Sequence, residues 1–225
     1  MDYKFLENTL LFQGITAEEI ESMINCLEGH VKKYMKGETI YHSGEIIQKA
    51  GLVLSGSVHI ENDDLWGNKT ILAHVGVGQV FAETYVCIPG EPLMINVVAA
   101  ETVEVLFLNL SRGTRTCVRN CAFHGRLIQN LLMISAQKNL NLSRRIFYSS
   151  SKSIRSRLLS YLSDQATRCG CLEFDIPFNR QQLADFLGVD RSAMSNELSK
   201  MQKAGFLKVN KNHFQLNASS FEHMT

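Results

Sequence analysis

The sequence contains little proline and no long apolar run. Only 3 of its 225 residues are proline, while 45% are hydrophobic and 20% are charged. This balance excludes a disordered tail protein and a collagen-like chain. No stretch approaches the roughly 18 uninterrupted apolar residues of a membrane span, and the opening MDYKFLENTL has no apolar signal core. We expect a cytoplasmic globular chain of one large or two smaller domains, with no membrane partner.

Cysteine is too sparse for a disulfide scaffold. The 6 cysteines are spread over 225 residues rather than packed into a short secreted chain. We therefore expect reduced thiols, which leaves redox and metal roles open.

Acidic residues are missing from a long internal stretch. No Asp or Glu occurs between Glu104 and Asp164, whereas residues 1–104 are rich in both. The basic residues of that interval are Arg112, Arg115, Arg119, Arg126, Lys138, Arg144, Arg145, Lys152, Arg155 and Arg157. This segregation indicates that the middle and C-terminal parts face a polyanion or another acidic surface, although a solvated helix face would give the same pattern.

Glycine spacing and β-branched runs predict an N-terminal β-roll. Residues 16–29 first form a short amphipathic helix with a Thr cap and a Glu three residues later. From Val31 to Leu108, turn signals then recur about every ten residues. The runs LVLSGSVHIE, TILAHVGVG and NVVAAETVEVLFL each fit one strand. Short strands at this spacing favour an antiparallel sandwich or roll over alternating β-α units.

Residues 122–147 are predicted to form one long helix. Two adjacent rows of apolar residues run along it: Leu127, Leu131 and Ile134 in one, and Ile128, Leu132 and Leu142 in the other. The combined stripe is wider than one contact face needs, so we expect the helix to pair with its own copy. Packing against the β-roll alone is the alternative.

A second domain is expected after the polar run from Ser149 to Ser153, which is a candidate hinge. The segment FNRQQLADFLGVDRSAMSNELSKMQKAGFL predicts two helices, capped by Asn179 and Asp190 and joined by a turn at Gly188. The outward residues of the second helix are Arg191, Ser192, Ser195, Asn196 and Ser199. This arrangement is typical of a helix-turn-helix, in which Arg pairs with guanine and Asn with adenine.

A short hairpin is expected to follow the two helices. The stretch FLKVNKNHFQL offers two strands around Asn210, Lys211 and Asn212. A wing of this kind, with basic Lys208 and Lys211, usually meets the phosphate backbone of DNA.

These features together resemble the family of the cyclic AMP receptor protein and FNR, which are bacterial transcription regulators. The resemblance covers almost the whole chain: KGETIYHSGE, LVLSGSVHI and VGVGQVFAE in the roll, the long helix, and NRQQLADFLGVDRSAMSNEL followed by a wing. It implies an α+β fold with an effector-sensing roll at 1–121, a dimerisation helix at 122–148 and a winged helix-turn-helix at 149–225. It further implies a homodimer on palindromic double-stranded DNA, with RNA polymerase as a further partner.

The same resemblance implies which residues contact DNA. Arg180 resembles the phosphate contact of the family, and the base-reading positions are occupied by Arg191, Ser192, Ser195 and Asn196. The family often has Glu followed four residues later by Arg at two of these places, where this chain has Ser192 and Asn196. We therefore do not expect this chain to prefer the operator sequence of those relatives.

Cyclic AMP is not expected to be the effector. The cyclic-nucleotide branch has a Glu and, about ten residues later, an Arg-Ser pair that holds the phosphate. Here Glu83 is present, but Leu93 and Met94 stand in place of the pair. We expect an apolar or aromatic effector near Glu83, Leu93, Met94, Ile134 and Lys138, between roll and long helix. Simple core packing by Leu93 and Met94 is the alternative.

A four-cysteine iron-sulfur cluster of the family type is also excluded, because only Cys26 precedes Cys87. Cys117, Cys121 and His124 share one helical face if a helix is continuous there. They form an alternative metal, haem or thiol sensor.

Enzyme activity is not expected. Small β-rolls also host cupin chemistry, but the sequence has no His-x-His pair, phosphate-binding glycine motif or nucleophile elbow. The stronger rival to a DNA-binding regulator is a ligand-binding adaptor that uses the helix-turn-helix only to contact proteins.

Overall fold

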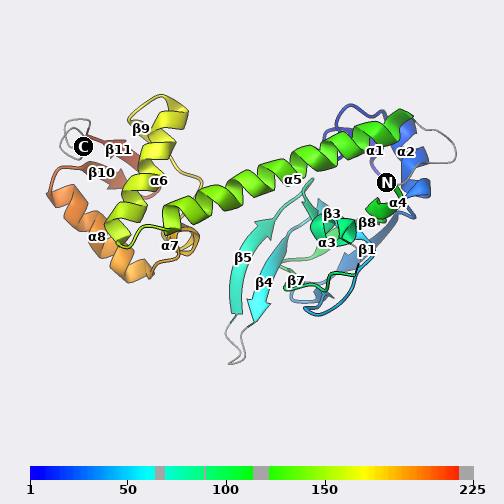
Figure 1. The fold of residues 1–225 in the computed structure, drawn as a ribbon, viewed down its shortest axis with the longest axis horizontal. Coiled ribbons are helices and arrows are strands. Elements are labelled where there is room, and N and C mark those ends of the chain that lie inside the picture. The colour runs from blue at the N-terminus through cyan, green and yellow to red at the C-terminus, as the bar shows by residue number, and fades with distance from the viewer. Residues whose placement is uncertain (64–68, 89, 114–121, 218–225) are drawn as a thin grey trace. The chain divides into compact units, whose positions relative to one another are not determined.

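The structure is a computed structural model that describes residues 1–63, 69–88, 90–113 and 122–217 (Figure 1). The chain forms two compact units, Met1–Gln137 and Lys138–Thr225. The boundary between them falls inside the long helix α5 (Ala122–Ser149). The bounds of α5 confirm the helix predicted at 122–147. Within the described ranges, no helix is both long enough and apolar enough to cross a membrane.

The first unit begins with two helices, α1 (Tyr3–Glu7) and α2 (Ala17–Cys26). Thr16 caps α2: its side chain accepts a hydrogen bond from the Glu19 backbone, and the Glu19 carboxylate accepts one from the Thr16 N–H at 3.0 Å. This reciprocal capping box confirms the helix predicted at the start of residues 16–29.

Two antiparallel sheets of four strands follow the helices. The first has the order β1-β8-β3-β6 and the second the order β2-β7-β4-β5. The strands are β1 (His30–Tyr34), β2 (Thr39–Tyr41), β3 (Ala50–Ser55), β4 (Val58–Asp63), β5 (Lys69–Val75), β6 (Val80–Phe81), β7 (Asn96–Ala99) and β8 (Val103–Leu108). Short helices α3 (Glu83–Cys87) and α4 (Leu110–Gly113) follow β6 and β8. The predicted antiparallel roll is therefore confirmed.

Two runs that were predicted as single strands each form two strands in different sheets. LVLSGSVHIE divides into β3 and β4, and NVVAAETVEVLFL divides into β7 and β8. The first break lies at Gly56, which has φ +71° and approaches the Thr102 carbonyl so closely that a Cβ atom would lie 2.3 Å from it. The prediction was wrong here because both runs turn a corner of the roll, and alternation alone does not mark that corner.

Two apolar cores fill the first unit. One lies between the sheets and includes Val53, Phe81 and Val97. The other joins β3 and β8 to α1, α2 and the start of α5, whose Leu127, Leu131 and Ile134 are buried there. The buried Asn130 side chain fixes this part of α5 further by donating hydrogen bonds to the Leu11 and Gln13 carbonyls at 3.0 and 2.9 Å.

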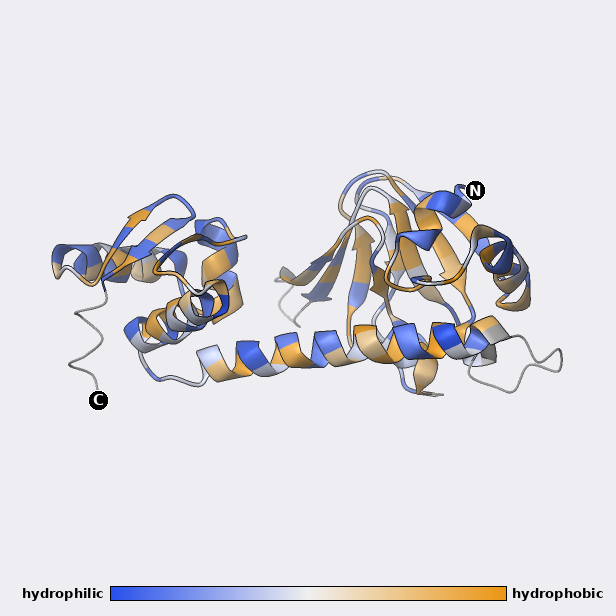
Figure 2. Ribbon diagram, turned by 90° about the horizontal axis from the view of Figure 1, so that it is seen from above, coloured by the Kyte–Doolittle hydropathy of each residue, from blue (hydrophilic) through white to orange (hydrophobic). Residues whose placement is uncertain are grey.

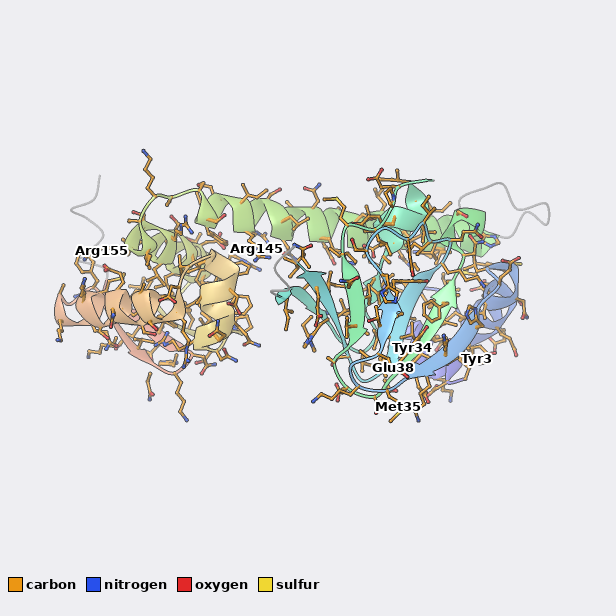
Figure 3. All side chains as sticks on the ribbon, turned by 90° about the horizontal axis from the view of Figure 1, so that it is seen from below. Tyr3, Tyr34, Met35, Glu38, Arg145 and Arg155 are labelled. Atoms are coloured by element: carbon orange, nitrogen blue, oxygen red, sulfur yellow. The ribbon has the colours of Figure 1, made fainter. Side chains whose placement is uncertain are left out.

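A side-chain hydrogen bond stabilises the turn between β1 and β2. After β1, the Met35 N–H donates a 2.7 Å hydrogen bond to the Glu38 carboxylate, and Tyr34 ends the strand beside them (Figure 3). This bond closes the turn into β2.

The second unit contains the C-terminal end of α5 and a small α/β domain. Its elements are α6 (Ile154–Cys169), β9 (Glu173–Asp175), α7 (Arg180–Leu187), α8 (Arg191–Lys203), β10 (Leu207–Asn210) and β11 (His213–Leu216). The strands form one sheet in the order β10-β11-β9. A single apolar core joins α6, α7, α8 and the sheet.

The polar run predicted as a hinge separates two helices. Helix α5 ends at Ser149, and Ser153 caps α6 by accepting a 3.0 Å hydrogen bond from the Ser156 N–H. The predicted helix after this run is confirmed, with Leu158 and Leu162 fully buried.

Candidate nucleic-acid interface

Three short polar signals build the helix pair α7 and α8. Asn179 and Gln182 cap α7 reciprocally, with hydrogen bonds of 2.8 and 3.0 Å. Gly188 ends α7 in the left-handed conformation at φ +63°, which only glycine adopts without strain. Asp190 then caps α8 by accepting a 2.7 Å hydrogen bond from the Ala193 N–H. The predicted helix-turn-helix is confirmed at each of these positions.

The inner faces of the two helices are apolar and buried. They consist of Leu183, Ala184 and Leu187 on α7 and of Met194, Leu198 and Met201 on α8. This packing leaves Arg191, Ser192 and Asn196 exposed on the outer face of α8, while Ser195 is half-buried. The outer face near the α8 N-terminus thus presents a guanidinium, an amide and hydroxyls, which are the groups that read base edges in a major groove.

Arg157 on α6 stabilises the turn between α7 and α8 through hydrogen bonds to backbone carbonyls. Its guanidinium donates hydrogen bonds to the Leu187 and Gly188 carbonyls at 3.0 and 2.9 Å and to the Ser151 carbonyl at 2.8 Å. It therefore connects the segment after α5 to the turn before α8. From the sequence Arg157 is only one basic residue among many, because nothing in its local spacing indicates that it donates to distant carbonyls.

The wing is a hairpin of β10 and β11. Asn210 pairs with His213, so Lys211 and Asn212 form a two-residue turn, with Lys211 exposed at φ +54°. The turn is held to the rest of the domain because Asn212 donates a 3.2 Å hydrogen bond to the Ile176 carbonyl. This confirms the predicted hairpin.

The structure brings Arg180 and Lys211 to one pocket of about 570 Å³, between the start of α7 and the wing turn. The Arg180 guanidinium lies over the Phe214 ring at 5.5 Å from its centroid, and its partial burial lowers its pKa. An arginine remains charged at neutral pH after such a shift. The two cations therefore lie together where the start of α7 meets the wing turn.

Charge is divided unequally between the two units. Residues 138–225 contain 13 Lys and Arg against 7 Asp and Glu, whereas residues 1–137 contain 10 against 15. Part of the positive charge is used internally: Arg155 on α6 lies 3.9 Å from Glu197 and stacks over Phe206 at 4.6 Å (Figure 3). The remaining excess suits a polyanion such as DNA.

The residues predicted for an effector lie in different surroundings. Glu83 and Leu93 are buried in the first unit, and Ile134 belongs to its helical core. Met94 is 71% exposed, and Lys138 is exposed at the start of the second unit. The effector pocket stays a prediction.

Of the alternative sensor residues, Cys117 and Cys121 lie outside the described part of the chain. His124 is 7% exposed, and its Nδ1 has no hydrogen-bond partner among the described residues. Across those residues, no group of three His, Cys, Asp or Glu side chains is placed to hold a metal ion.

A winged helix-turn-helix that follows a β-roll and a long helix is the arrangement of a DNA-binding protein with a second, separate domain. Residues 31–120 match the model of the cyclic nucleotide-binding domain, and residues 156–218 match the Crp-like helix-turn-helix domain. The chain belongs to the CRP/FNR family of DNA-binding transcription regulators.

Individual relatives agree with this assignment. The chain is 30% identical over 103 residues to the cyclic AMP receptor protein of Thermus thermophilus, a stretch that spans 46% of each protein. It is 22% identical over 177 residues, 77% of each chain, to the cAMP-activated global regulator CRP of Haemophilus influenzae. The solved structure of OCPA-complexed CprK has the same fold, with a TM-score of 0.66 at 16% identity over 90% of this chain and 93% of that one.

Proposed function

We propose that the protein is a homodimer that binds a palindromic operator through α8 under the control of a small molecule other than cyclic AMP. The observation that carries the proposal is the outer face of α8, where polar side chains surround a helix N-terminus above a fully apolar inner face. Helices of this kind place their N-terminal residues against base edges in the major groove.

Roles follow from where each side chain lies. Arg191 and Asn196 are exposed on α8 and are assigned to guanine and adenine edges, with Ser192 and Ser195 beside them. Arg180 and Lys211 share the pocket beside the wing and are assigned to backbone phosphates. RNA polymerase is the further partner that family membership suggests.

A row of exposed apolar side chains on α5 supports the homodimer. Ile128, Leu132, Leu142 and Ile146 are all exposed, with Ser135 and Asn139 between them. These six residues follow one another at alternating steps of four and three, which is the spacing of a coiled-coil seam. Hydrophobic residues recur along the whole of α5 (Figure 2), and the first row, at Leu127, Leu131 and Ile134, is already buried. The second row is therefore left exposed by the part of the chain that the structure describes.

The residues of the roll do not fit a cyclic phosphate. The positions that need a guanidinium and a hydroxyl hold Leu93, which is buried, and Met94, which is exposed. Glu83 is present and buried, as the cyclic-nucleotide branch requires, but a phosphate placed there would meet no guanidinium from this pair. Proteins of the same fold differ in their small molecules: CprK is complexed with OCPA, and the regulator CLP of Xanthomonas campestris is c-di-GMP responsive. We infer an apolar or aromatic effector.

The test is a mobility shift of the full chain on a random-sequence DNA pool. We expect retarded DNA whose repeated selection enriches a defined sequence. A variant with Arg191→Ala and Asn196→Ala should fold, as judged by an unchanged thermal midpoint, yet enrich nothing. A wild-type protein that retards no DNA would contradict the proposal and favour the protein-binding adaptor.

A further inference from the structure

A pocket of about 360 Å³ lies in the second unit where the end of α5, α6 and α7 pack together. Its volume is within the range of small-molecule sites. Its walls combine four aromatic rings with two guanidinium groups: Tyr148, Tyr161, Phe178, Phe186, Arg144 and Arg168. None of these residues belongs to the outer face of α8, the wing or the effector residues predicted in the roll.

The aromatic walls form one connected cluster. The Tyr161 ring lies 5.5 Å from Tyr148 and 5.6 Å from Phe186 between ring centroids, and Phe178 lies 4.9 Å from Phe186. Aromatic rings pack favourably against one another in edge and inclined arrangements of this kind, so a further ring can pack against the cluster. The walls therefore suit an aromatic ligand body.

One residue that lines the pocket carries a polar group without a partner among the described residues. Tyr161 is 2% exposed, and its hydroxyl makes no hydrogen bond with any described residue. The neighbouring Tyr148 hydroxyl, in contrast, donates a 2.6 Å hydrogen bond to Asp164. A buried hydroxyl without a partner destabilises the folded chain, so such a group requires an explanation.

Charges around that hydroxyl favour an anion. Arg168 lies 4.0 Å from Asp164 and is 53% exposed at the side chain, and Arg144 has an amide partner, Asn141, at 3.4 Å. Two guanidinium groups thus line the pocket, and among the described residues only that of Arg168 has a carboxylate neighbour within 4.0 Å. Burial, with smaller effects from Tyr148 and Asp164, raises the pKa of Tyr161 above its ordinary value, so the hydroxyl stays protonated at neutral pH and can donate.

We propose that this pocket binds a small aromatic carboxylate, with its ring against Tyr148, Phe178 and Phe186 and its carboxylate between Arg168 and the Tyr161 hydroxyl. Guanidinium and hydroxyl donors together hold a carboxylate through charge-assisted hydrogen bonds. The site is separate from the operator-binding surface, and its test needs no DNA. A failure there leaves the proposed function standing.

The experiment is fluorine NMR of para-fluorophenylacetate titrated with the full chain. We expect saturable broadening with a dissociation constant below about 1 mM. The neutral amide of the same compound should bind the wild type about 10-fold more weakly than the acid does. The acid should bind the Arg168→Gln variant about 10-fold more weakly than it binds the wild type. Arg155→Gln, which removes the same charge elsewhere on α6, should bind like the wild type. Absence of binding, equal binding of acid and amide, or equal effects of the two arginine variants would overturn the proposal.

Tyr161→Phe separates a ligand-binding hydroxyl from a structural one. Because the hydroxyl has no partner among the described residues, its removal should leave the thermal midpoint unchanged or raise it, while weakening binding of the probe several-fold. A lowered midpoint with unchanged probe affinity would contradict the role assigned to the hydroxyl.

Discussion

In the proposed function, single side chains on α8 supply sequence recognition and single side chains on the wing supply general affinity for DNA. Arg191 stands exposed at the first turn of α8, whereas Lys211 stands exposed at the tip of a hairpin. A guanidinium at a guanine edge contributes sequence information, and an ammonium at a phosphate contributes none. The two residues should therefore respond differently to mutation.

We expect Arg191→Ala to cost about 1–3 kcal/mol per half-site and to relax the preference at one base position. Lys211→Ala should weaken binding to all sequences alike and reduce the salt dependence of the affinity. Affinities measured on an operator and on its single-base variants, at two salt concentrations, distinguish the two effects. An equal loss on every sequence for Arg191→Ala would show that this residue contacts only phosphate.

His213 on the wing should titrate above its ordinary value of 6.5. Hydrogen bonds to Asp175 and Glu173, at 3.0 and 3.1 Å, favour its protonated form and raise its pKa. A raised pKa in the folded state means that this contact stabilises the wing fully below pH 6.5. That stabilisation is lost as the pH rises through the folded-state pKa.

An NMR titration of the His213 ring measures this shift. Asp175→Asn should lower the pKa toward 6.5, and Glu173→Gln should lower it less, because the Asp175 hydrogen bond is the larger cause. A His213 pKa at or below 6.5 in the wild type would contradict the contact.

At the scale of the element, α5 carries two apolar faces, of which one is buried and the other is exposed. Leu127, Leu131 and Ile134 are buried in the first unit, and Leu132 and Ile146 are exposed. Leu132→Glu should convert the proposed dimer to monomers, because a carboxylate cannot be buried without a partner in a helix seam. Sedimentation equilibrium of the purified variant measures this change.

Met133→Glu provides the matched control for Leu132→Glu. Met133 is 57% exposed and adjoins Leu132, but it lies outside the row with alternating steps of four and three. Its variant should remain dimeric. Two dimeric variants, or a monomeric wild type, would contradict the proposed seam.

Local sequence signals predicted most elements but not the corners or the long-range contacts. The caps at Thr16, Asn179 and Asp190 act within four residues of the helix they start, so spacing alone reveals them. The break at Gly56 depends on the approach of Thr102, which lies far along the chain. The same holds for Arg157, whose carbonyl partners were not predictable from its neighbours.

At the scale of the whole molecule, the β-roll and the helix-turn-helix are those of the CRP/FNR family, while the residues that would hold a cyclic phosphate are not. Calorimetry with cyclic AMP and cyclic GMP should therefore detect no binding at micromolar concentrations, because Leu93 and Met94 offer the phosphate neither charge nor a hydroxyl. Micromolar binding that also raises operator affinity would contradict the effector assignment.

The symmetry of the selected DNA tests the central claim most directly. Two α8 helices related by a two-fold axis require two inverted half-sites, with centres about 10 base pairs apart, because each helix enters a successive major groove. Sequencing of the pool enriched by the full chain should therefore yield an inverted repeat with one fixed spacing. Enriched sites that are single, direct or irregularly spaced would contradict a homodimer that reads DNA through paired recognition helices.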